Sequence, residues 1–397
     1  MTDKTRSVVA VALGAILCVL LAGTSTLADN TKSFEYNLYG YFKLDGAYDQ
    51  NLTSHGNFAM WVKPQSYEDD DDQFNMTANQ SRFGLNLAGK GYEDVKINGK
   101  VEFDLYAGVT GATIAENKPM LQLRHAYFTV QKGGTKLLAG QSTDLISPLN
   151  PSTLNYSVLW GVGNIGYRRA QVSLWQTFKA GETNVTMAGG AFRTIGNDLT
   201  PTFTLALGET ADGADDGTDA GIPSVQGLLD VKHSFASGAA LQLGVSGLWG
   251  KLKAETNLGN YEDYESWIAS GHLQIDFSKA FGVSGEVYSG SNGGSYFAGI
   301  ANNSKVDGVA SFGAWGSVWA QVSPRVKFSA GYGMDDPEDE DLNTGDRVYN
   351  QCVYGNITYK LVDPVAVGFE LSQWQTDYLD GEQAKTMRAQ TSFQLNF

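Results

Sequence analysis

The chain has 397 residues, of which 47 are glycine, 9 are proline and 12 % are aromatic, and it carries a formal net charge of −15. Its two cysteines exclude a disulfide framework and argue against a cysteine-based metal site, since one of them lies in a predicted leader. The acidic balance argues against nucleic-acid binding, and after the leader no apolar stretch reaches the 18 residues typical of a transmembrane helix.

Residues 1–28 have the pattern of a cleaved secretory signal. A basic start precedes an apolar run at residues 8–22, and small residues follow up to Ala28, where a signal peptidase would cut. We therefore expect residues 29–397 to be exported through the periplasm and to form one domain.

The remaining sequence consists of segments in which apolar and polar residues alternate. In the first of them, Phe42 and Leu44 alternate with Lys43 and Asp45, so that one face meets an apolar phase and the other a polar one. Sixteen segments show this pattern: 34–49, 80–89, 96–108, 120–131, 136–141, 166–178, 183–193, 224–235, 239–253, 264–277, 281–289, 308–322, 325–334, 347–360, 365–377 and 385–397.

Short and long connections alternate between these segments. Two-residue connections such as 133–134 alternate along the chain with long ones such as 50–79 and 196–223. Long loops at one rim and short turns at the other are typical of a transmembrane antiparallel β-barrel, with the short turns in the periplasm and the long loops outside the cell. The last segment ends on Phe397, which resembles the terminal signal for outer-membrane barrel assembly. A soluble edge strand would leave its apolar face and open edge unexplained.

In such a barrel the polar face of each strand points into the lumen, which makes those side chains the candidate pore lining. After closure, the first three strands and the last one would bring Arg388, Lys43, Arg82 and Lys100 onto one basic wall, which favours anions in a narrow aqueous pore. The alternative is that these cations only pair with inward carboxylates. The predicted inward set is Lys43, Asp45, Arg82, Lys100, Glu102, Asp104, Arg169, Asp230, Lys232, Glu286, Arg325, Lys327 and Arg388.

Residues 142–165 form an unusual long connection, because Asp144 is their only charged residue. A loop so rich in Ser, Thr, Asn and Pro, with several leucines, can fold inward and narrow the lumen. Asp144 and Arg169 would then define the constriction. The alternative is that this loop packs against a neighbouring subunit.

Three acidic runs, residues 69–72, 212–219 and 335–341, are predicted to be solvated loops, and two of them, 69–72 and 335–341, are weak candidates for divalent cations. The four histidines lie on different segments without a catalytic motif around them. We therefore predict no enzyme, no catalytic residues, no cofactor and no defined metal site.

Six further motifs follow one another along the chain: GYFKLDGAYD (40–49), QSRFGLNL (80–87), VEFDLY (101–106), LRHAYF (123–128), LLAGQSTDLISPLNP (137–151) and GNIGYRRAQ (163–171). In this order they resemble the DcaP-type porins of Gram-negative bacteria. The resemblance implies a trimer of sixteen-stranded barrels with inward-folded loops. It also implies a cation-lined constriction that passes small anions such as dicarboxylates, with the cationic role on Arg82, Arg124, Arg168 or Arg169.

The sequence thus predicts a porin in the outer membrane of a Gram-negative bacterium, in contact with lipid and lipopolysaccharide. It would allow passive diffusion of small hydrophilic solutes with a modest preference for anions such as small carboxylates. The alternatives are an adhesive surface barrel without transport and, as a weaker one, a barrel hydrolase.

Overall fold

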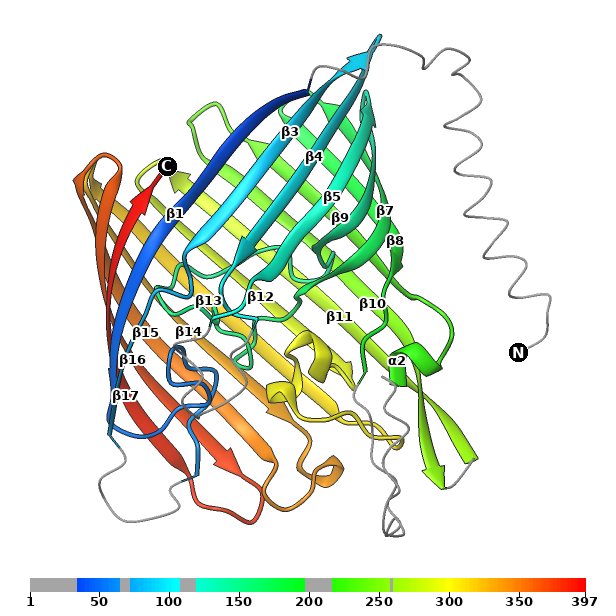
Figure 1. Ribbon diagram of the computed structural model, residues 1–397, viewed down its shortest axis with the longest axis vertical. Helices are drawn as coiled ribbons and strands as arrows, with labels where there is room; N and C mark the ends of the chain where they lie inside the picture. Colours follow the sequence, from blue (N-terminus) through cyan, green and yellow to red (C-terminus); the bar gives the residue numbers. More distant parts are fainter. Residues whose placement is uncertain (1–33, 65–71, 108–118, 197–215, 258–259) are drawn as a thin grey trace.

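The computed structural model describes residues 34–64, 72–107, 119–196, 216–257 and 260–397. The predicted signal at residues 1–28 lies outside these ranges. The described chain forms one closed antiparallel sheet with long tilted strands (Figure 1). Among the described residues, no helix is both long and apolar enough to cross a membrane.

The barrel closes where β1 (Phe34–Asp49) pairs with β17 (Ala384–Asn396). On its other side β1 pairs with two strands: its first half with β3 (Arg82–Tyr92) and its second half with β2 (Gln73–Thr77). These two strands together fill a single place in the wall, so seventeen strands make a barrel of sixteen. The predicted sixteen-stranded barrel is confirmed.

The other strands follow in chain order around the wall. They are β4 (Val95–Asp104), β5 (Gln122–Lys132), β6 (Thr135–Thr143), β7 (Arg168–Ala180), β8 (Thr183–Phe192), β9 (Ser224–Ser234), β10 (Ala240–Asn257), β11 (Asn260–Ser278), β12 (Phe281–Ser291), β13 (Ala310–Ser323), β14 (Val326–Pro337), β15 (Arg347–Val362) and β16 (Val365–Tyr378). Helical turns are short: α2 (Asp216–Asp219), η1 (Gly294–Tyr296), η2 (Gly299–Ala301) and η3 (Asp339–Asp341).

Two details differ from the sequence prediction. Strand β2 lies inside the predicted loop 50–79, and a turn in which Ser81 N donates to Ala78 O (2.9 Å) separates it from β3. The β10–β11 hairpin continues to Asn257 and Asn260, beyond the predicted ends, because cross-strand pairing persists to its tip.

The distribution of polar and apolar side chains in the barrel is the reverse of that in a water-soluble protein. On β1 the charged Lys43, Asp45 and Asp49 are buried on the inside, whereas Phe42 and Leu44 are exposed on the outside. An apolar outer face with a polar interior is the pattern of a wall that faces lipid. Both ends of the barrel sequence, the start of β1 and the end of β17, lie at the rim with the short turns (Figure 1).

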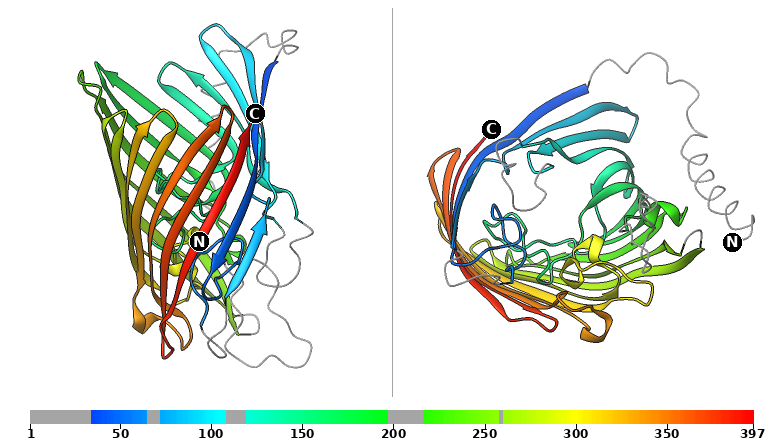
Figure 2. Two further views of the ribbon diagram at one scale, coloured as in Figure 1. Left: turned by 90° about the vertical axis from the view of Figure 1, so that its left-hand side faces the viewer. Right: turned by 60° about the horizontal axis from the view of Figure 1, so that its bottom comes forward.

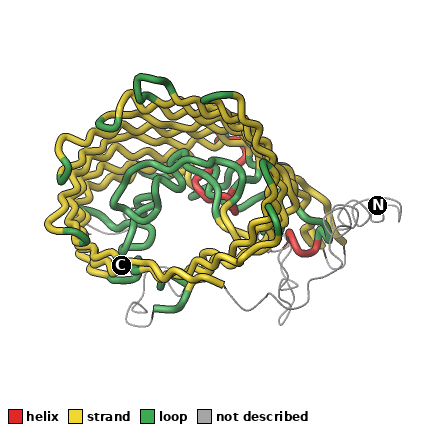
Figure 3. The backbone as a smooth tube through the Cα atoms, turned by 90° about the horizontal axis from the view of Figure 1, so that it is seen from above, coloured by secondary structure: helices red, strands yellow, loops and turns green. Residues whose placement is uncertain are grey.

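The lumen is partly filled by chain that folds inward from the long-loop rim (Figures 2 and 3). The apolar side chains of these inward loops pack on the inner side of β13 to β17 and form the main hydrophobic core. The members of this core are Ala59, Val62, Leu149, Leu159, Val162, Trp315, Cys352, Tyr354, Trp374, Tyr378 and Ala384.

Candidate pore and its lining

The connection between β6 and β7, residues 144–167, is the main inward segment. Its first anchor is Glu286 on β12, whose carboxylate accepts hydrogen bonds from Ser147 Oγ and from Leu149 N (2.8 Å). Trp315 Nε1 donates to the same carboxylate at 3.0 Å. A buried carboxylate is tolerated only when such donors replace water, so Glu286 fixes this part of the segment to the wall.

The second anchor is Glu370 on β16, which is 1 % exposed. It accepts hydrogen bonds from Leu154 N (2.6 Å), Asn155 N (3.2 Å) and Asn356 Nδ2 (2.9 Å). Backbone N–H groups of the inward segment thus point at a carboxylate fixed on a strand. The two anchors hold residues 147–155 across the inner side of β12 to β16.

The inward segment also binds the connection that follows β1. Asn155 accepts from Ala59 N (3.1 Å) and donates to Ala59 O (2.8 Å). Asn350 Nδ2 on β15 donates to both Met60 O and Gly161 O, at 2.7 Å each. Gly163, at φ +93°, lies so close to β13 that a Cβ there would fall 2.2 Å from Ala314 O. These contacts make residues 50–64 and 144–167 one packed unit.

Aromatic rings extend this unit towards β7 and η1. Tyr156 stacks tilted on Tyr106 with ring centroids 4.2 Å apart, and Trp160 stacks on Phe297 at 4.6 Å. Tyr167 meets both Trp160 and Phe297 edge-on. The rings bury one another, so they stabilise the inward loops against each other.

The opposite side of the lumen, formed by β1 and β3 to β5, carries a cluster of charges centred on Glu102. Its carboxylate accepts from Tyr39 Oη (2.6 Å) and Arg124 Nε (2.8 Å). Lys100 Nζ and Arg82 Nε lie 3.5 and 3.6 Å from it, and these two side chains remain 25 % and 22 % exposed. The Glu102 cluster therefore gathers more cations than its carboxylate can neutralise.

Arg124 owes its position to a bulge. The register between β4 and β5 shifts there, because Phe103 pairs with Leu123 whereas Glu102 pairs with His125. The extra residue on β5 turns inward. Arg124 Nη1 reaches Asp104 at 2.7 Å in addition to Glu102. Strict alternation cannot place this side chain, which explains why only the family resemblance singled it out.

Arg168, the first residue of β7, is the least satisfied cation of the lumen. Its guanidinium stacks on the ring of Tyr167 at 4.2 Å and is only 7 % exposed. Its Nε and Nη2 have no hydrogen-bond partner among the described residues. A buried guanidinium with free donors favours an anion or ordered water beside it.

Two other predicted pore cations point inward but serve to hold the loops. Lys43 binds Asp45 (3.2 Å), Gln80 Oε1 (2.6 Å) and Leu154 O (3.2 Å). Arg388 binds Asp49 (2.7 Å) and donates to the backbone oxygens of residues 56 and 57. The predicted basic wall is thus corrected: Arg82 and Lys100 keep exposed charge, whereas Lys43 and Arg388 are buried and paired.

Arg169 and Asp144 form an ion pair at 2.9 Å, as the predicted constriction requires, but both side chains are buried. Asp144 also accepts from Gln226 Nε2 (2.7 Å) and Tyr167 N (2.9 Å). Arg169 lies 3.7 Å from the ring of Tyr296 and donates to a backbone oxygen of η1. This pair therefore joins β7 to the base of the inward segment.

The last two predicted residues lie near the short-turn rim. Lys327 on β14 donates to Ser152 Oγ at 3.3 Å and lies 5.6 Å from the ring of Trp319. Arg325 is exposed in the turn between β13 and β14. The structure therefore does not bring Arg325 together with the Glu102 cluster.

The acidic runs are less uniform than predicted. Asp335 belongs to β14, is fully buried and accepts from Tyr288 Oη at 2.6 Å, so it is not part of a solvated loop. Asp216 is buried as well and accepts from Tyr264 Oη (2.5 Å). Residues 69–71 and 212–215 lie outside the described residues. Within the described parts of the chain, no three His, Cys, Asp or Glu side chains are grouped closely enough to hold a metal ion.

No protein-family model and no curated protein sequence matches this chain. Among solved structures, the outer membrane channel DcaP of Acinetobacter baumannii matches 94 % of this chain and 99 % of its own, with a TM-score of 0.70 at 20 % identity. The anion-selective porin from Comamonas acidovorans has a TM-score of 0.55 at 11 % identity, covering 92 % of this chain and 100 % of its own. Salmonella typhi OmpF has a TM-score of 0.56 at 11 % identity, covering 91 % and 97 %.

These likenesses extend over nearly the whole of each chain, although few residues are identical. They confirm the fold that the resemblance to the DcaP-type porins implied. The chain therefore has the fold of the outer-membrane porins.

Proposed function

We propose that this protein is a porin of the Gram-negative outer membrane through which small hydrophilic solutes diffuse, with a preference for small anions such as carboxylates. The arrangement of the inward segment and of the cations in the lumen supports this proposal. The inward segment is anchored on β12 and β16, and its Tyr156 donates to Asp104 (3.2 Å) beside the Glu102 cluster. Solutes would pass beside this contact, along the partly exposed Arg82 and Lys100, with the short turns in the periplasm and the inward segment as the constriction.

The charges of that passage favour anions. Among the described residues, Arg82, Lys100 and Arg124 form ion pairs with only two carboxylates, Glu102 and Asp104, and Arg168 forms none. The carboxylates hold Arg124 in place, whereas Arg168 keeps free donors. Fixed cations in a narrow aqueous pore lower the electrostatic barrier for anions and raise it for cations. The anion-selective porin among the structural neighbours supports the same preference.

The assembly that we propose is a homotrimer in the lipid and lipopolysaccharide of the outer membrane. Structural neighbours include a trimeric outer-membrane protein of Vibrio cholerae, which supports this assembly. The apolar outer face of the barrel would contact lipid and the neighbouring subunits.

The test is the reversal potential of the reconstituted protein in a planar bilayer under a salt gradient. We expect the anion-selective sign, and a shift towards zero for Arg168→Gln, because the variant removes a guanidinium with free donors. Arg325→Gln is the matched control, since that arginine is exposed at the rim. A bilayer without channels would refute the porin function, and a cation-selective reversal potential would refute the anion preference.

A further inference from the structure

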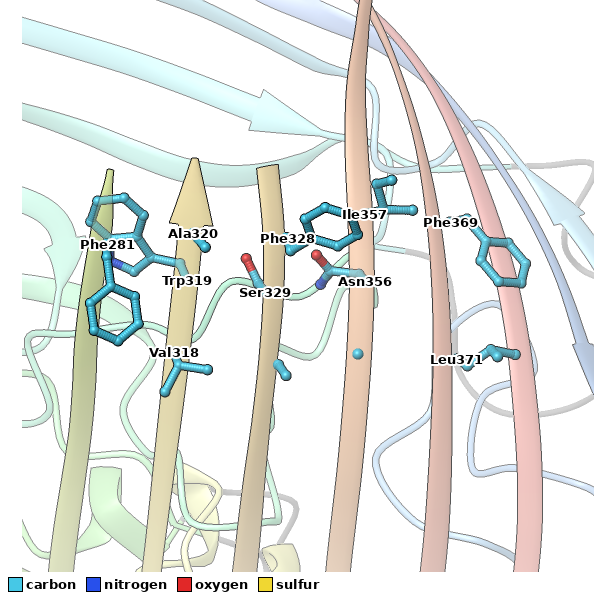
Figure 4. Close-up of a pocket in the computed structure, with 12 residues that line it drawn as sticks. Phe281, Val318, Trp319, Ala320, Phe328, Ser329, Asn356, Ile357, Phe369 and Leu371 are labelled. Carbon is cyan, nitrogen blue, oxygen red and sulfur yellow. The ribbon is translucent and has the colours of Figure 1, made fainter. Parts of the chain in front are cut away.

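The inner wall of the barrel has a polar pocket of about 560 Å³ near the short-turn rim, over β1 and β3 to β6. It differs in kind from the groove on the outer wall over β12 to β16, which is lined mainly by apolar side chains such as Phe281, Phe328 and Leu371 (Figure 4). The neutral hydrogen-bonding side chains of the polar pocket are Asn37, Asn86, Asn98, Tyr127, Thr129 and Gln131.

The strand register places these side chains in the lumen. Within β4, Asn98 and Lys100 are in phase with Glu102, whose carboxylate points into the lumen. Thr129 of β5 pairs with Asn98, and Asn86 of β3 pairs with Lys100. Side chains of directly paired residues lie on the same face of a sheet. The pocket therefore opens into the lumen, where a solute can reach it.

The neutral side chains of the pocket keep their hydrogen-bonding groups free. Those of Asn86, Asn98 and Thr129 form no hydrogen bond with any other described residue. Thr129 is only 8 % exposed, and a buried hydroxyl without a protein partner favours water or a solute beside it. By contrast, the inward Gln394 at the same rim donates to Asn396 at 2.8 Å.

The charges of the pocket are arranged with a direction. Lys136 of β6 has the same inward phase, lies 4.1 Å from the ring of Trp175, and forms no ion pair within the described ranges. It is a diagonal neighbour of Thr129 across the β5–β6 pair, at roughly 7–8 Å. The carboxylate of the pocket, Glu35, lies on β1, four strand spacings or roughly 19 Å from Lys136. The pocket is therefore positive at its β6 side and negative at its β1 side.

We propose that this pocket is a binding site for hydroxylated carboxylates such as sugar acids, with the carboxylate at Lys136 and the hydroxyl groups on Thr129 and Asn98. Amide and hydroxyl side chains both donate and accept hydrogen bonds, which suits a chain of hydroxyl groups. Glu35 repels a carboxylate from the far side and so orients the solute. The inference rests on the proposed porin function, because the solute reaches the pocket through the lumen, and it adds a solute class and a second site to that function.

The test is saturation-transfer difference NMR of the full barrel in detergent with three probes: gluconate, acetate and glucose. Gluconate has both a carboxylate and hydroxyl groups, whereas acetate and glucose have one kind each, so we expect gluconate to bind most tightly. Lys136→Gln should weaken gluconate binding about fivefold and leave glucose binding unchanged. Thr129→Val keeps the shape of the side chain and should weaken the binding of gluconate and glucose alike, by about threefold.

Lys232→Gln is the matched control, because Lys232 is an exposed cation of β9, in phase with the inward Asp230, at the same rim but outside the pocket. We expect it to leave gluconate binding unchanged. Equal weakening by Lys136→Gln and Lys232→Gln would overturn the proposal, and so would acetate that binds as tightly as gluconate. Conductance of the same preparations tests the pore separately. Channels without the effect of Lys136→Gln refute the site alone, whereas a barrel that binds gluconate at Lys136 but forms no channels refutes the porin function alone.

Discussion

The two sides of the lumen use inward glutamates in opposite ways. On β4, Glu102 is shared by side-chain cations, two of which keep more than a fifth of their surface exposed. On β12 and β16, the carboxylates of Glu286 and Glu370 accept hydrogen bonds from backbone N–H groups of the inward segment and from neutral side chains of the segment and the wall. The same residue type on the same face of a strand therefore organises charge on one side and anchors a loop on the other.

This difference shows that a charged side chain can point into the barrel without acting on the ions that pass through the pore. A cation contributes to the field of a water-filled passage only where carboxylates leave it uncompensated and solvent reaches it. By that criterion Arg82 and Lys100 belong to the pore, whereas Lys43 and Arg388 belong to the packing. Arg168 lies between the two groups, because it has unpaired donors but is buried. The predictions below separate these two groups.

The largest expected effect is the loss of stability in Arg388→Ala. Both side chains of its pair with Asp49 are fully buried, so the variant leaves an uncompensated carboxylate inside the barrel. Breaking a buried pair in this way costs about 3–5 kcal/mol of unfolding free energy. Urea unfolding of the refolded barrel in detergent measures it. If Arg388 were instead a pore cation, ion selectivity would change while stability did not.

The next effect concerns the loop anchor. Glu370→Ala removes an acceptor from three donors, which should lower the unfolding free energy by about 2–3 kcal/mol. The inward segment should also detach locally, giving larger and noisier single-channel conductance. Glu370→Gln keeps one acceptor oxygen and should show an intermediate effect. Conductance traces identical to the wild type would contradict the anchoring role.

A smaller effect is expected from Glu102→Gln, which removes the negative centre of the Glu102 cluster while keeping its shape. Anion selectivity should increase by a few-fold, because the three cations around it lose their counter-charge. The reversal potential in a salt gradient measures the change. Reduced anion selectivity would mean that Glu102 matters mainly by positioning Arg124.

The smallest expected effect is that of Lys100→Gln, since this side chain is partly exposed and its field is screened. The anion-to-cation permeability ratio should fall by less than about twofold at low salt and not measurably at high salt. Lys179→Gln, which removes an exposed cation at the short-turn end of β7, serves as the control. An equal change in both variants would show a general surface-charge effect.

Much of the fold could be predicted from the sequence. A closed barrel in a membrane needs apolar side chains on its outer face and polar side chains on its inner face, and this need produces the alternation with a period of two residues. Lipid outside and polar groups inside leave each strand one register. Two features broke that rule and were missed: the interruption that creates β2, and the bulge that turns Arg124 inward.

The candidate site was harder to predict for a related reason. Alternation shows that Lys43, Arg82 and Arg388 point inward, but the loops decide which of them stay exposed. Residues 50–64 and 144–167 cover Lys43 and Arg388 through contacts between segments far apart in the chain. Glu370 was overlooked, although its place on the inward face of β16 was visible in the alternation.

The reversal potential of the wild-type channel, measured across a salt gradient at low and at high ionic strength, tests the central claim most directly. An uncompensated cationic side of the pore predicts anion selectivity at low salt that weakens as salt screens the charges. Cation selectivity under both conditions would contradict the account, because the inward carboxylates rather than the cations of the Glu102 cluster and Arg168 would then dominate the field.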